Sequence, residues 1–164
     1  MVHFALPCSF FFQAPDEANR KKLKRSGLAM ARAALRIIKN CVQFGIAWTL
    51  EHPEGSRIWT WPPLHRVLMI CVCCVVLIDY CQYGMHYRKP AFVCASRREF
   101  IELGQTCRVT HLHDVLAGSF KMPDGKSCWL MSLACAYPAK LAQVHARIAT
   151  HLAPISAARR NGDA

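Results

Sequence analysis

The chain has 164 residues, of which 53% are hydrophobic and 19% are charged, and its formal net charge is +11. This length fits one domain with a buried core, and this composition excludes a chain that is disordered throughout. The excess of Lys and Arg favours a polyanion such as nucleic acid as a partner, because clustered cations release condensed counterions when they bind it.

The first third of the chain predicts a strand, a helix and a second strand. The apolar run Val2–Leu6 predicts a strand that ends at Pro7, and Ile46–Leu50 predicts another, followed by a loop over Glu51–Gly55. Between the strands, apolar residues recur at three- and four-residue steps up to Gly45, as in an amphipathic helix. Its core face is expected to hold Leu28, Ala31, Leu35, Ile38 and Val42. This order is typical of a βαβ unit.

The middle of the chain contains the longest uncharged apolar run, Val67–Ile78. It is too short for a helix that spans a bilayer, which needs roughly 20 residues. Its Val, Ile and Cys content instead predicts a strand buried on both faces and closed by Asp79. An irregular turn over 59–63 and a short helix around Leu64–Met69 are expected to lead into this strand, which ends near Ile78. We therefore expect no membrane association. Ala91–Ala95 predicts a further strand, and Pro138–Leu152 predicts a final helix.

Ten cysteines in a chain of this size do not predict a disulfide framework. Most lie in or beside apolar runs, as buried free thiols do, and no basic leader precedes the first apolar stretch. We expect an intracellular protein, with nucleus and cytoplasm not distinguished. Cys107, His111 and His113 are weak candidates for a metal site, which would need a fourth ligand from Cys94, Cys128 or elsewhere. A polar, hydrogen-bonded loop is the other interpretation.

Four segments follow one another in an order that suggests a known family. They are Leu6–Phe11 with its Pro-Cys pair, Glu51–Pro53, Gln82–Lys89 and Ala136–Ala142. In sequence order they resemble the catalytic Pro-Cys loop, the Glu-Asn-Val segment, the basic Gln-x-Arg-x-Arg segment and the Gly-Asn-Ala-Val-Pro motif. These are motifs of the cytosine-5 DNA methyltransferase family, whose compact and divergent members are carried by phages and mobile elements.

The resemblance implies an α/β fold with a partial Rossmann-like methyltransferase sheet, corresponding to the later half of that fold, flanking helices and a short irregular insertion. It implies one methyltransferase-like domain over residues 1–153, a short target-recognition-like insertion over 96–133 and a frayed tail over 154–164. The family's glycine motif for S-adenosylmethionine belongs upstream of the Pro-Cys loop. We therefore expect a truncated protein with an incomplete methyl-donor pocket.

The resemblance also implies a chemistry, the transfer of a methyl group from S-adenosylmethionine to cytosine in DNA. Cys8 would be the nucleophile that adds to the ring, and Glu51 would donate to ring nitrogen 3 and stabilise the charge that develops. Pro7, Arg88 and Lys89 would contact the flipped base or the DNA backbone. Pro138 would be a weak contact for the cofactor.

Three interpretations of the function stay open. The first is a methyltransferase-like protein, active or decayed, in which His52 replaces the Asn that braces the catalytic loop in the family. The second is a non-catalytic basic module that binds nucleic acid or pairs with a complementing methyltransferase subunit. The third is a small Cys-rich α/β or membrane-associated protein with chance motif matches. The basic run Arg20–Arg25, continued at helical spacing by Arg32, Arg36 and Lys39, fits a DNA contact and a solvated helix face equally.

Overall fold

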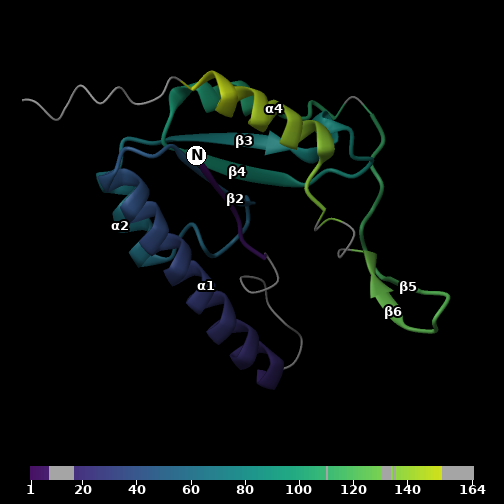
Figure 1. The fold of residues 1–164 in the computed structure, drawn as a ribbon. Helices are drawn as coiled ribbons and strands as arrows, with labels where there is room; N and C mark the ends of the chain where they lie inside the picture. The colour runs from purple at the N-terminus through teal and green to yellow at the C-terminus, as the bar shows by residue number, and fades with distance from the viewer. Residues whose placement is uncertain (8–16, 110, 131–133, 135, 153–164) are drawn as a thin grey trace, which may run out of the picture.

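The computed structural model describes residues 1–7, 17–109, 111–130, 134 and 136–152, and its architecture is α/β (Figure 1). The strands are β1 (Val2–Ala5), β2 (Trp48–Pro53), β3 (Cys74–Asp79), β4 (Pro90–Ala95), β5 (Ser119–Lys121) and β6 (Ser127–Trp129). The helices are α1 (Glu17–Gln43), α2 (Pro62–Ile70) and α4 (Ala139–His151), and two 3-10 segments are η2 (Tyr80–Tyr83) and η3 (Arg98–Leu103).

The central sheet has four strands in the order β1-β2-β4-β3, and its directions are mixed. β1 and β2 are parallel and α1 joins them, so the predicted βαβ unit is confirmed. β4 lies between β2 and β3 and runs antiparallel to both. The segment between β3 and β4 holds only residues 80–89, which is shorter than the crossover that a parallel pair needs.

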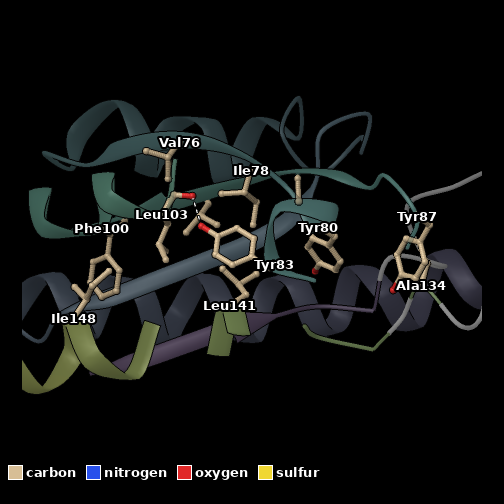
Figure 2. Close-up of a cluster of buried hydrophobic side chains, with 13 residues drawn as sticks. Val76, Ile78, Tyr80, Tyr83, Tyr87, Phe100, Leu103, Ala134, Leu141 and Ile148 are labelled. Carbon is tan, nitrogen blue, oxygen red and sulfur yellow. Dashed lines mark hydrogen bonds between the residues drawn. The ribbon is translucent and has the colours of Figure 1, made fainter. Parts of the chain in front are cut away.

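The sheet separates two hydrophobic cores. α1 and α2 cover one face and α4 covers the other (Figure 1). Successive residues of β4 serve both cores, since Val93 belongs to the α4 side and Cys94 to the α1 side, and both are fully buried. In Figure 2, Phe100 and Leu103 of η3 lie against Leu141 and Ile148 of α4, in the core on the α4 side of the sheet.

The run Val67–Ile78 contains the end of a helix and a strand. The short helix predicted around Leu64–Met69 is confirmed as α2, and the strand predicted to end near Ile78 corresponds to β3, Cys74–Asp79. The prediction that this strand is buried on both faces is wrong, because β3 is an edge strand of the sheet and Val75 is largely exposed. An apolar run does not by itself show whether a strand lies at the centre or at the edge of a sheet.

The second strand begins and ends later than predicted. β2 includes Glu51, His52 and Pro53, which the sequence assigned to a loop. All three pair with β4 and are buried. Pairing with the central strand therefore extends β2 through residues whose local signals favour a turn.

The two long helices lie close to their predicted positions. Gly45 adopts a left-handed φ of 65° just after α1, as expected for the residue that ends it. Val42 is exposed, so its predicted place on the core face of α1 is wrong, and Cys41 is buried at that turn. In α4, Leu141 and Ile148 are buried as predicted. No helix in the described part of the chain is long and apolar enough to cross a membrane.

Truncation of Ile148 tests the packing of α4 on the sheet. Ile148 is 4% exposed in α4, whereas Ile70 is 83% exposed at the end of α2. We expect Ile148→Ala to lower the free energy of unfolding by about 2–5 kcal/mol, because it opens a cavity in the core. Ile70→Ala is the matched control and should change it by less than about 0.5 kcal/mol in urea titrations. Equal effects of the two substitutions would contradict this packing.

Candidate active site

A cluster of polar side chains lies at the carboxyl ends of the two parallel strands. The register pairs Ala5 of β1 with Glu51 of β2, so the chain leaves β1 for Leu6 and Pro7 beside Glu51. Open α/β sheets bind ligands where the carboxyl ends of parallel strands meet. This edge of the sheet is therefore the candidate active site.

Glu51 is an acidic side chain buried in the sheet, with 4% of its surface exposed. The Tyr80 hydroxyl donates a 3.0 Å hydrogen bond to Glu51 Oε1. Burial raises the pKa of Glu51, while the charge of Lys89 and the hydrogen bond from Tyr80 act in the opposite direction. A carboxyl with a raised pKa holds a proton more readily at neutral pH, so Glu51 is suited to donate one.

Lys89 and two tyrosines surround Glu51. Lys89 Nζ lies 4.5 Å from the centre of the Tyr80 ring and donates a 2.9 Å hydrogen bond to the Ala134 carbonyl. The rings of Tyr80 and Tyr137 meet edge to face. Burial raises the pKa of Tyr137, and its hydroxyl has no hydrogen-bond partner among the described residues. The cluster thus offers a carboxyl, an ammonium and a free hydroxyl in one buried region.

Two histidines extend the polar cluster along the same face of the sheet. Thr49 Oγ1 lies 2.8 Å from His3 Nδ1 and 2.9 Å from His145 Nε2. Burial and the neighbouring His145 lower the pKa of His3 to about 4, and burial lowers that of His145. Both rings are therefore neutral at pH 7. This array fixes α4 to β1 and β2.

The structure places the other predicted site residues as follows. Cys8 lies outside the described residues, and Pro7 is exposed just after β1. Arg88 Nε donates to buried Asp79 at 3.0 Å. Pro138 is buried and caps the N-terminus of α4. Glu51 and Lys89 thus lie together, while the Arg88 guanidinium is held at the end of β3.

The weak metal candidates form a second cluster, at the end of β3. Cys107, His111 and His113 converge there, and the structure adds Cys81 of η2. The sequence analysis placed the fourth ligand at Cys94, Cys128 or elsewhere and did not single out Cys81. The only sequence signal for Cys81 was its place two residues after Asp79, where a strand ends. Cys94 is instead buried in the core beside α1.

The exposed face of α1 is strongly basic. Arg25, Arg32, Arg36 and Lys39 are exposed on it, and the sequence of residues 25–43 contains no acidic residue. The side chains of residues 17–24, which hold most of the basic run, lie outside the described part. A groove of about 510 Å³ runs between α1 and α2, lined by Ala29, Arg32, Leu35, Arg36, Trp61 and Pro63.

Comparisons with protein-family models, with curated proteins and with solved structures found no match.

Substitution of Tyr80 tests the electrostatics of Glu51. We expect Tyr80→Phe to raise the pKa of Glu51 further, because it removes a hydrogen bond that favours the carboxylate. The variant should lose about 1–3 kcal/mol of unfolding free energy at neutral pH, and less at low pH where Glu51 is protonated. The measurements are a carbon-13 NMR titration of the Glu51 carboxyl and urea unfolding at both pH values.

Tyr83→Phe is the matched control, since the Tyr83 hydroxyl donates to the Leu103 carbonyl and not to a carboxylate. The loss of unfolding free energy in Tyr83→Phe should not depend on pH over the range in which Glu51 titrates. A Glu51 pKa that falls in Tyr80→Phe would contradict the assigned hydrogen bond.

Proposed function

We propose that the chain performs the cytosine chemistry of a cytosine-5 DNA methyltransferase-like protein, with Cys8 as the nucleophile and Glu51 as the acid. The observation that carries this proposal is the register between Ala5 and Glu51. It brings the segment that leads to Pro7 and Cys8 to the edge of the sheet where a buried carboxyl has a raised pKa. The resemblance of these segments to the family's motifs supports the same assignment.

In the proposed reaction, the Cys8 thiolate forms a bond to carbon 6 of cytosine. The π electrons of the carbon 5–carbon 6 bond move into the ring, and Glu51 transfers its proton to nitrogen 3. Carbon 5 becomes nucleophilic and takes an electrophile. Solvent water takes the original proton from carbon 5 as the thiolate is expelled, and the carboxylate takes back the proton from nitrogen 3. The Tyr80 hydroxyl holds the carboxyl in place through its hydrogen bond, and the charge of Lys89 favours the carboxylate form.

The described residues do not fit a site for S-adenosylmethionine of the family's kind. Such a site needs a glycine-rich turn between a strand and a helix, where backbone N–H groups approach the ligand closely. In the described ranges β1 leads into Leu6 and Pro7, and β2 leads into Glu54 and Gly55 and then a Trp- and Pro-rich turn. We therefore assign no step to the methyl donor, and the proposal concerns the cytosine ring.

Hydrogen exchange at carbon 5 tests this chemistry without a methyl donor. In D₂O the nucleophilic carbon 5 takes a deuteron, so each turnover raises the mass of a cytosine-containing DNA strand. We expect exchange with the full chain, its loss in Cys8→Ser, and a decrease of about 10²–10⁴-fold in Glu51→Gln. Mass spectrometry of the recovered DNA measures each rate.

The control for this test is Cys71→Ser, a half-buried thiol on the segment between α2 and β3 that should leave exchange unchanged. Circular dichroism verifies that each variant folds. Exchange that survives Cys8→Ser would contradict the assigned nucleophile. Absence of exchange in a chain that binds the DNA would leave binding as its function.

The basic face of α1 favours a second candidate, a nucleic-acid-binding module without chemistry. Arg32 and Arg36 share one groove with Trp61, and arginines beside an aromatic ring suit a single strand, whose phosphates and bases they contact together. Residues 25–43 of α1, which include Arg32 and Arg36, contain no acidic residue. Under this candidate the groove between α1 and α2, and not the Glu51 cluster, is the binding site.

Salt dependence tests the second candidate. We expect the double variant Arg32→Ala/Arg36→Ala to reduce the slope of log Kd against log salt concentration by about 1.4 for a single-stranded oligonucleotide, because two cations no longer neutralise phosphates. Arg98→Ala/Arg147→Ala removes two exposed arginines from η3 and α4 and is the matched control. Equal slopes for the two double variants, measured by fluorescence anisotropy, would exclude the groove as the nucleic-acid-binding site.

A further inference from the structure

The Cys/His cluster at the end of β3 is a candidate metal site that the cytosine chemistry does not use. One ligand atom from each of Cys81, Cys107, His111 and His113 lies within 4.8 Å of the other three. Cys107 Sγ and His113 Nε2 are 3.4 Å apart. Ligands of a tetrahedral zinc ion, with Zn–S near 2.3 Å and Zn–N near 2.0 Å, are separated by roughly 3.3–3.8 Å. The cluster needs a contraction of about 1.5 Å at most between any two ligand atoms to reach that geometry.

The backbone around the cluster fixes both ends of the segment that supplies three ligands. Asp79 is fully buried and its Oδ2 accepts a 2.7 Å hydrogen bond from the Cys107 N–H. The Asp79 N–H donates to the Gln105 carbonyl, and the Asp114 N–H donates to the His86 carbonyl. The ligand segment is thus attached to β3 on one side and to the segment before β4 on the other.

The ligand segment has no core of its own. Between Gly104 and Gly118 the described residues form no helix or strand. Val109 and Leu112, which lie between the ligands, are 68% and 98% exposed. Leu116 packs against the core at the end of the segment, but burial of apolar side chains does not hold the stretch around Val109 and Leu112 in place. Another interaction must order that stretch. A metal ion that joins four side chains is such an interaction.

The turn at Val109 directs a backbone donor at the Cys107 sulfur. Val109 has φ = 57°, a left-handed conformation that is costly for a β-branched residue. In this conformation its N–H donates a 3.2 Å hydrogen bond to Cys107 Sγ. The Gln82 side chain points a second N–H donor at Cys81 Sγ, at 3.8 Å. Donors aimed at both sulfurs are what metal-bound thiolates require.

We propose that Cys81, Cys107, His111 and His113 bind one Zn²⁺ ion in a structural site that orders residues 104–109 and 111–116. Two sulfurs and two imidazole nitrogens are the ligand set that selects Zn²⁺, and four protein ligands leave no position open for a substrate. Two Zn–S bonds form as the two thiols release their protons to solvent. The site stands independently of the cytosine chemistry.

Metal analysis of the full chain tests the proposal. Expressed with zinc and purified without chelator, the chain should carry about one zinc per chain, measured by mass spectrometry of the elements. Cys107→Ser and His113→Ala should each lower the affinity for zinc at least about tenfold, measured in competition with a chelator. Cys71→Ser and His65→Ala, which lie outside the cluster, are the matched controls and should retain it.

Replacement of zinc by Co²⁺ distinguishes a variant that does not fold from one that folds without a metal site. Co²⁺ in place of zinc should give visible bands of a tetrahedral complex and a thiolate charge-transfer band in the ultraviolet. Cys107→His keeps four ligands but removes one thiolate, so it should still bind Co²⁺ with about half of the charge-transfer intensity. Metal-free wild-type chain, zinc retained in Cys107→Ser, or a Cys81–Cys107 disulfide found by peptide mapping would each overturn the proposal.

Discussion

The insertion of β4 between β2 and β3 is the interaction on which the rest of the structure depends. Ala91, Val93, Cys94 and Ala95 are all fully buried, because β4 has a strand on each side and a helical layer on each face. Antiparallel pairing with β2 draws Glu51 and His52 into the sheet, and pairing with β3 brings Asp79 and Tyr80 alongside. The positions of both polar clusters follow from this one strand.

Local periodicity was enough to predict the helices and the βαβ unit. The apolar stripes of α1 and α4 extend over several turns, so an error at one position such as Val42 does not change the prediction. Strand limits and directions depend on partners far away in the sequence. Glu51–Pro53 carry turn signals and are nevertheless strand residues, because β4 pairs with them. The mixed direction of the sheet has the same origin.

In the candidate sites, too, short motifs could be predicted from the sequence, whereas contacts between residues far apart in the sequence could not. Glu51 could be singled out from the sequence through its resemblance to a short motif, and its position beside Ala5 fits that interpretation. Tyr80, which donates to Glu51, and Cys81, which completes the Cys/His cluster, could not. Their roles arise from residues 29 positions before Tyr80 and 26 or more positions after Cys81, and no spacing rule joins such pairs.

The consecutive residues Asp79, Tyr80 and Cys81 contact three different groups. Asp79 anchors the ligand segment and Arg88, Tyr80 faces the buried carboxyl, and Cys81 faces the histidines. Adjacent residues share a peptide plane, so a backbone rotation at one of them shifts the next. Tyr80 and Cys81 therefore connect the Glu51 cluster and the Cys/His cluster through one turn of backbone. A shift of the backbone at Cys81 would also move the phenol that tunes the acidity of Glu51.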